Sequence, residues 1–394
     1  MKRHSLNHQK ISRRSILAGA TAIGGASLLS GLTRPAWAQN GLQVTIADIG
    51  VGNPRGDWSR FTDATGHSVN LVAIGNAPSA IVNQLLAGGG RENFDIIHIV
   101  GGMQSPLAEA NLIEEIDTSR LPNWENNTYI SEYLASGTPG FDFIGFDDKI
   151  YGVPTILQAD SFAYLPDETG ELDSYGALFD PRFRGLVALE DNYTTAGQKT
   201  ALYLKQSGQA EIEDPADMTP EELRVVIDFL IEQKRQGQFR VLWSSFEQAV
   251  SLLVSKEVHV IDCWEPMVMA ANEQGGNVRY ASPKEGFLLW AMAAYLVNNP
   301  NRTEEERTAA YDLLNFMLGP WYGATITGMQ GYMTNPQAVE FAETSDAFTP
   351  EQAQQISAID ARVKEKFSFG GTWQNRWPTN VDAYEEEWQR FKSA

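Results

Sequence analysis

The chain has 394 residues, with 30 lysines and arginines against 50 aspartates and glutamates, and its net charge at pH 7 is −20. So acidic a surface repels nucleic acids and anionic lipid head groups, and we expect no nucleic-acid partner. A single cysteine, Cys263, excludes an internal disulfide framework.

The first 38 residues have the pattern of an export signal. Arg13-Arg14 precede an apolar stretch rich in glycine and alanine, and Ala36-Trp37-Ala38 offers a small-x-small cleavage site. The paired arginines resemble a twin-arginine signal, although an ordinary secretory signal would lead to the same compartment. We therefore expect residues 1–38 to be a signal peptide and the remaining 356 residues to be soluble in the periplasm. Six basic and no acidic residues lie in the signal, so the mature charge is −26.

Strands and helices alternate after this signal. Strands are predicted at 42–49, 68–74 and 94–100, and helices at 54–64, 78–86 and 105–116. Short glycine-rich segments separate them, which is typical of a parallel α/β unit. Gly88-Gly89-Gly90 is no phosphate loop, because it follows a helix and lacks the G-K-[ST] that such loops need.

A crossing into a second lobe is predicted at 150–157, which reads I-Y-G-V-P-T-I-L. Pro154 in this run indicates an edge or crossing segment rather than a central strand. Further strands and helices follow, and 294–297 is predicted to cross back. Strands are expected at 186–189 and 239–243, and helices at 195–206, 220–236, 246–254, 303–316 and 381–392.

The predicted fold is α/β, with two lobes that each hold a mixed sheet flanked by helices. Lobe 1 comprises 39–157 and 292–340, and lobe 2 comprises 158–291 and 341–394. Two or three crossing segments would act as a hinge, with a ligand cleft between the lobes.

Two tryptophans follow short apolar runs in the second lobe. Val258–Ile261 precedes Trp264, and 287–289 precedes Trp290. Ligands of open α/β sheets bind beyond the carboxyl ends of strands, and indoles supply rigid walls with a polar N–H edge. Either tryptophan is equally compatible with a place in the core.

Several motifs, in one order over 240 residues, resemble those of a known family. They are N-F-D-I-I at 93–97, Y-G-V-P at 151–154, Y-G-A-L-F-D-P-R-F-R-G at 175–185, E-V at 257–258, P-K-E-G at 283–286, L-L-N-F-M-L at 313–318 and G-Y at 331–332. Together they resemble the extracellular solute-binding proteins of ABC importers, specifically the spermidine/putrescine-binding type.

The resemblance implies a two-lobed periplasmic binding protein of type II-like fold, with no catalytic residues, no metal and no cofactor. Such a protein captures a small polyamine-like, cationic or zwitterionic solute by interlobe closure. It then delivers the solute to a membrane permease with a cytoplasmic ATPase. We expect a monomer.

The resemblance also places aromatic residues in the ligand cleft. At the positions where the family has acidic residues that contact the ligand, this chain has other residues. Met292 stands where the family has an aspartate, and Asn192 and Thr195 stand at acidic positions of another loop. A buried ammonium that loses a charged partner costs on the order of 2–5 kcal/mol. We therefore hypothesise a ligand with fewer amine ends than spermidine, met by substitute acids such as Asp160. The predicted ligand-binding residues are Trp264, Trp290, Tyr332, Gln374, Asp191, Asn192, Glu265, Asp48, Gln158 and Met292.

Two alternatives are a ferric-iron-binding relative of the same fold and a secreted enzyme. The chain has no adjacent tyrosine pair, and His67, His98 and His259 match no metal-ligand spacing. It has no G-x-S-x-G or H-E-x-x-H motif. Asp262 and Glu265 form a close acid pair, but such pairs arise by chance in so acidic a chain.

Overall fold

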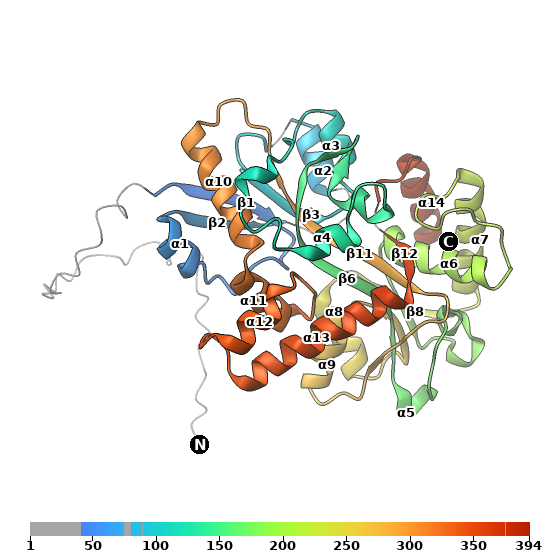
Figure 1. The fold of residues 1–394 in the computed structure, drawn as a ribbon. Helices are drawn as coiled ribbons and strands as arrows, with labels where there is room; N and C mark the ends of the chain where they lie inside the picture. Colours follow the sequence, from blue (N-terminus) through green and yellow to red (C-terminus); the bar gives the residue numbers. More distant parts are fainter. Residues whose placement is uncertain (1–40, 75–79, 89, 375) are drawn as a thin grey trace, which may run out of the picture. The chain divides into compact units, whose positions relative to one another are not determined.

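The computed structural model describes residues 41–74, 80–88, 90–374 and 376–394 (Figure 1). The predicted signal peptide, residues 1–38, lies outside the described residues. Asn40–Ala394 forms one compact unit. In the described part of the chain, no helix has both the length and the apolar character needed to cross a membrane.

A mixed sheet of ten strands organises the described part of the fold. Its main path runs β2 (Ser68–Ala73), β1 (Gln43–Asp48), β3 (Ile96–Val100), β11 (Phe287–Leu296), β6 (Gly152–Tyr164), β9 (Val260–Cys263), β7 (Val187–Glu190) and β8 (Phe239–Trp243). In addition, β10 (Arg279–Tyr280) pairs with β6, and β12 (Gly371–Trp373) pairs with β11. The outer pairs are parallel, whereas β11 is antiparallel to both β3 and β6. These strands and the surrounding helices confirm the α/β prediction.

The two central strands, β6 and β11, are longer than predicted and buried at every residue. Of the predicted crossing segments, residues 152–157 lie in β6 and residues 294–296 lie in β11. Pro154 pairs with Ala293 of β11, whereas β9 and β10, the other neighbours of β6, pair only with its residues 161–164. At Pro154 the strand therefore has the edge or crossing character that the sequence indicated. The ladder tolerates this proline because the register shifts between Met292 and Ala293 and leaves Thr155 without an opposite residue.

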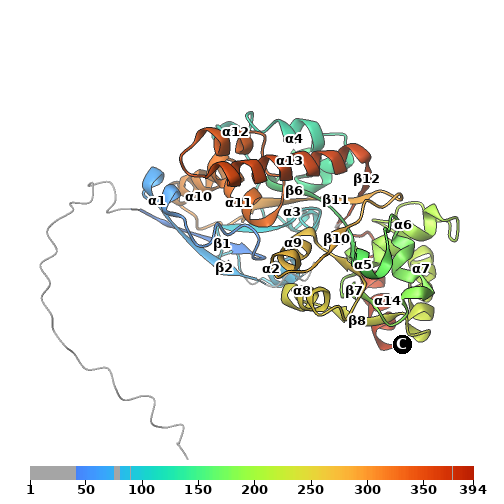
Figure 2. The ribbon, with the colours of Figure 1, turned by 90° about the horizontal axis from the view of Figure 1, so that it is seen from below.

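The helices lie at both ends of this sheet. Those on the side of β1–β3 are α1 (Ser59–Thr65), α2 (Ala80–Leu86), α3 (Ser105–Glu109), α4 (Thr128–Tyr133) and α10 (Glu304–Met317). Those on the side of β7–β9 are α5 (Pro166–Thr169), α6 (Gln198–Gln206), α7 (Pro220–Arg235), α8 (Phe246–Val254), α9 (Glu265–Glu273) and α14 (Val381–Ser393). Figure 2, like Figure 1, shows α1 and α10 near β1 and β2, with α6, α7 and α14 together at the other end.

Local sequence chemistry explains several helix ends. Thr219 and Thr303 each begin a helix with a capping box, in which the hydroxyl and a glutamate three residues later bond each other's backbone. The predicted helix at 105–116 is wrong in its second half. The chain turns at Asn111, whose φ is 54°, and Ile113 then forms an isolated bridge with Val297.

Apolar side chains form separate cores on the two sides of the β6–β11 pair. The largest core gathers residues from 44–157 and 290–363, and two others gather residues from 162–288 and 384–391. We propose that these groups are the cores of the two lobes. The lobe limits themselves stay a prediction. The helices α12 (Gln337–Thr344) and α13 (Pro350–Phe369) pack against α11 (Pro320–Gln330).

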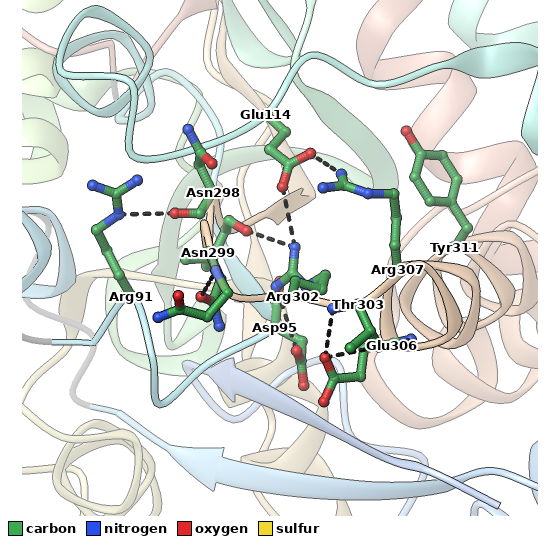
Figure 3. Close-up of polar contacts among 12 residues, drawn as sticks. Arg91, Asp95, Glu114, Asn298, Asn299, Arg302, Thr303, Glu306, Arg307 and Tyr311 are labelled. Atoms are coloured by element: carbon green, nitrogen blue, oxygen red, sulfur yellow. Dashed lines mark hydrogen bonds and ion pairs between the residues drawn. The ribbon is translucent and has the colours of Figure 1, made fainter.

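A buried ion-pair cluster holds the junction between β11 and α10 (Figure 3). The Arg302 side chain is only 1% exposed, and its guanidinium lies 3.3 Å from both Asp95 Oδ1 and Glu114 Oε1. It also donates to the carbonyl of Val297 at 2.7 Å, while Arg307 pairs with the same Glu114. The start of β3 and the segment after α3 are thereby tied to the start of α10.

Candidate functional site

The candidate site lies where β6 and β11 pass between the two groups of core residues. Gln158 on β6 pairs in register with Trp290 on β11, and both side chains are buried. The ring of Tyr332 meets the Trp290 indole edge-on, with 5.4 Å between centroids. Gln374, directly after β12, is fully buried and donates from Nε2 to Asp160 Oδ2 at 3.0 Å. The predicted residues Trp290, Tyr332, Gln374 and Gln158 therefore lie close to Asp160.

Three buried polar atoms in this group make no hydrogen bond of standard geometry among the described residues. They are Asp160 Oδ1, Gln374 Oε1 and Trp290 Nε1. Burial raises the pKa of the Asp160 carboxyl, while Lys199 and the nearby Trp290 indole act in the opposite direction. The Trp290 indole still acts on the Asp160 carboxylate as a hydrogen-bond donor, so these two atoms are poorly bonded to each other, and Gln374 Oε1 has no partner among the described residues. An unsatisfied buried polar group costs about 1–3 kcal/mol, so this arrangement is unfavourable in an isolated protein. The arrangement is typical of a site whose ligand supplies the missing partners.

A second acidic group lies beyond Asp160, at the ends of β7 and β9. Asp262 and Lys199 form an ion pair with no exposed side-chain surface. The backbone N–H of Glu190 donates to Asp262 Oδ2 at 3.3 Å, and Glu190 Oε2 accepts from Trp264 Nε1 at 3.1 Å. Burial, followed by the charge of Asp262, raises the pKa of Glu190 to about 8. Asp160, Glu190 and Asp262 together raise the pKa of Lys199 against the effect of burial.

A third group joins α13 to the start of α9. Lys366 Nζ lies 2.7 Å from Glu265 Oε2, and it donates to Gln158 Oε1 at 3.2 Å. The other oxygen of Glu265 lies 2.8 Å from Arg362 Nε. Gln158 Nε2 donates to the carbonyl of Gly331 at 2.9 Å, next to Tyr332. Both oxygens of the predicted ligand residue Glu265 are thus occupied by cations of the chain.

Of the remaining predicted residues, Asp191 and Asn192 are engaged by neighbouring parts of the chain. Asp191 accepts from Trp388 Nε1 at 2.8 Å and from Lys392 Nζ at 3.1 Å. Asn192 caps the helical turn at 193–197 by accepting from the backbone N–H of Thr194 at 2.9 Å. Their roles in ligand binding stay predictions.

Asp48 and Met292 are also tied to the interior. Asp48 Oδ2 lies 2.5 Å from Nδ1 of the buried His98, whose Nε2 lies 2.6 Å from Thr155 Oγ1. Met292 is fully buried on β11, and its carbonyl accepts from Thr155 Oγ1 at 3.3 Å. For these two residues as well, ligand contact stays a prediction.

Sequence reasoning missed Glu190, Lys199 and Lys366 and considered Asp262 only as half of a chance acid pair. A signal existed for Asp262, because it stands between Ile261 and Cys263 in an apolar strand where an unpaired charge is rare. Within the described ranges, no set of three or more histidine, cysteine, aspartate or glutamate side chains is arranged to hold a metal ion.

Comparisons with known proteins agree with this architecture. The Pseudomonas aeruginosa putrescine/agmatine-binding protein is 25% identical over 300 residues, covering 71% of this chain and 74% of that protein. The Haemophilus influenzae spermidine/putrescine-binding periplasmic protein 1 is 23% identical over 352 residues, covering 86% of each chain. A solved structure of a putative spermidine/putrescine ABC transporter protein from Listeria monocytogenes has a TM-score of 0.69 at 20% identity. The similarity covers 89% of this chain and 98% of that one.

These matches confirm the two-lobed binding-protein prediction and favour it over the ferric-iron and enzyme alternatives. Residues 59–353 match the bacterial extracellular solute-binding proteins, so the match spans most of the chain. The chain therefore belongs to the bacterial extracellular solute-binding protein family, which supplies the substrate-binding components of ABC importers.

Proposed function

We propose that this protein captures a small cationic or zwitterionic solute in the periplasm and delivers it to a membrane permease with its ATPase. The observation that carries the proposal is the set of buried polar atoms on Asp160, Gln374 and Trp290 that make no hydrogen bond of standard geometry, beside the ring of Tyr332. A carboxylate with a free oxygen suits an ammonium, and aromatic faces suit both the cation and its methylene groups. The curated relatives are named for amine ligands, which agrees with this chemistry.

Interlobe closure is the proposed mechanism. Trp290 and Tyr332 belong to one core group, whereas Trp264 packs against the other. A ligand that contacts both groups only in the closed form shifts the population toward that form. The closed form would then dock on the permease as a monomer. We propose that residues 1–38 direct export by the twin-arginine route.

Thermal unfolding of the mature protein with putrescine, agmatine, butylamine and 4-aminobutyrate tests the proposal. A ligand present at 100 times its Kd stabilises the folded state by about 2.7 kcal/mol, so a binding solute raises the melting temperature. Asp160→Asn and Trp290→Ala should abolish this increase. Asp228→Asn is the matched control, because that aspartate of α7 is exposed and pairs with Arg390 on the neighbouring α14.

The proposal fails if no compound of this set raises the melting temperature of the unaltered protein. It also fails if a compound stabilises the Asp160→Asn and Asp228→Asn variants equally, because binding would then not involve Asp160. Stoichiometric recovery of the unchanged solute after binding separates a binding protein from an enzyme.

A further inference from the structure

The carboxylates around the candidate site fall into two classes. Glu265 and Asp262 are each neutralised by a buried lysine of the chain, Lys366 and Lys199. No lysine or arginine within the described ranges forms an ion pair with Asp160 or Glu190. Burial raises the pKa of the Asp160 carboxyl, and the charges of Lys199 and Lys366 both lower it, so both lysines lie near Asp160.

Lys366 occupies the kind of environment that a buried ligand ammonium needs. Its Nζ lies 2.7 Å from Glu265 Oε2, 3.2 Å from Gln158 Oε1 and 3.1 Å from the carbonyl of Ala159. It also lies 4.8 Å from the centroid of the Tyr280 ring. A carboxylate, two neutral acceptors and an aromatic face use all three ammonium protons and compensate part of the lost hydration, while burial still lowers the pKa of Lys366.

The Lys366 position is also part of the candidate site. Gln158, which accepts from Lys366, is the cross-strand neighbour of Trp290. The charges of both Asp160 and Glu265 act on the buried phenol of Tyr332 and raise its pKa, after the larger effect of burial. Tyr332 therefore stands close to one carboxylate that has an internal ammonium and one that has none.

The number of carboxylates without a lysine partner limits how many ammonium groups the ligand can carry. Asp160 is an available partner for one ammonium, because no lysine or arginine of the described residues forms an ion pair with it. Glu190 is a poor second partner, since its Oε2 already accepts from Trp264 Nε1 at 3.1 Å and burial, followed by the charge of Asp262, raises its pKa to about 8. A second ligand ammonium would meet carboxylates that are protonated or already paired with lysine.

We infer that Lys366 and Lys199 are specificity-determining residues that restrict the ligand to a solute with a single ammonium group and exclude diamines. This inference rests on the proposed function, because it concerns the same site. It separates this chain from the curated relatives, which are named for putrescine, agmatine and spermidine.

Calorimetric titration with compounds of one chain length tests the inference. Putrescine, butylamine and 4-aminobutyrate share four carbons, but only putrescine carries two ammonium groups. The unaltered protein should bind butylamine or 4-aminobutyrate at least roughly tenfold more tightly than putrescine, because a buried charge without a partner weakens binding by a decade or more.

Variants of Lys366 identify the cause. Lys366→Met frees a Glu265 oxygen and should raise the affinity for putrescine roughly tenfold, with little change for the single-ammonium compounds. Lys366→Arg keeps the cation and should keep the discrimination. Lys256→Met is the matched control, since Lys256 also pairs with a glutamate but lies exposed at the surface. Lys199→Met gives the same test for the group at the ends of β7 and β9, because it leaves Asp262 without its lysine partner.

The outcomes are distinct. If the unaltered protein binds putrescine most tightly and Lys366→Met leaves that preference unchanged, the inference is overturned while the proposed function stands. If none of the compounds binds the unaltered protein or the variants, both are overturned. If Lys366→Met does not fold by circular dichroism, the affinity ratio of the unaltered protein and its retention in Lys366→Arg decide the question.

Discussion

The buried carboxyl of Glu190 predicts how the free energy of unfolding changes with pH. Its pKa rises from 4.5 to about 8 in the folded protein, chiefly through burial and then through the charge of Asp262. Between these two values the folded state holds a proton that the unfolded chain has released. The stabilisation is therefore complete below pH 4.5 and is lost as the pH rises through about 8.

The magnitude follows from the number of protons involved. One proton changes the free energy of unfolding by at most about 1.4 kcal/mol per pH unit. Between pH 5.5 and 7.5, Glu190 should thus remove up to about 2.7 kcal/mol of stability. Glu190→Gln keeps the size of the side chain and an oxygen that can accept from Trp264, but it cannot ionise. The variant should gain this amount relative to the unaltered protein across the same interval.

Urea unfolding at pH 5.5, 6.5 and 7.5, followed by circular dichroism, measures this difference directly. Glu304→Gln is the control, since the Glu304 side chain is 70% exposed and should follow the unaltered protein. Ionisable groups that do not interact with Glu190 affect both proteins alike and cancel in the comparison. If the stabilities of Glu190→Gln and the unaltered protein stay parallel over the whole range, the reasoning is refuted, because Glu190 is then ionised in the folded state.

Three further predictions concern stability and are measured by urea or thermal unfolding. Lys199→Met should lower the free energy of unfolding by about 3–5 kcal/mol, and adding Asp262→Asn should restore most of it, because the cost lies in the unpaired charge; equal stability of the single and double variants would contradict this. Arg302→Met should cost a similar amount, whereas Arg182→Met, at a surface ion pair, should change stability by less than about 1 kcal/mol. Gly331→Ala should destabilise by about 1–3 kcal/mol, since φ is +75° and the new Cβ would lie 2.7 Å from a methionine sulfur; an unchanged melting temperature would show that the helix end relaxes freely.

The parts of the fold that the sequence predicted are those set by local patterns. Apolar periodicity placed most strands and helices, and the threonine–glutamate spacing marked the starts of α7 and α10. The family resemblance predicted Trp290, Tyr332 and Gln374 as residues of one ligand cleft, and the structure places them near one another, while their contact with a ligand stays a prediction. The contacts between these side chains could not be predicted from any local sequence pattern.

The internal ion pairs could not be predicted for the same reason. Lys366 and Glu265 are 101 residues apart, and Lys199 and Asp262 are 63 apart. A lysine on a helix is usually solvated, so nothing local distinguishes these two from surface charges. The capping role of Asn192, in contrast, was readable, because an asparagine two residues before a threonine commonly accepts from that backbone N–H.

The β6–β11 pair has a consequence for the cooperativity of the whole chain. Its residues contribute to the cores on both sides, so neither half possesses a complete sheet once the shared strands are removed. Unfolding of one core would remove hydrogen-bond partners and apolar packing contacts from the other. We therefore expect a single calorimetric transition, and we expect that protease cleavage does not release an autonomously folded half. Recombination between related proteins would have to exchange both central strands as a unit, because they belong to neither half alone.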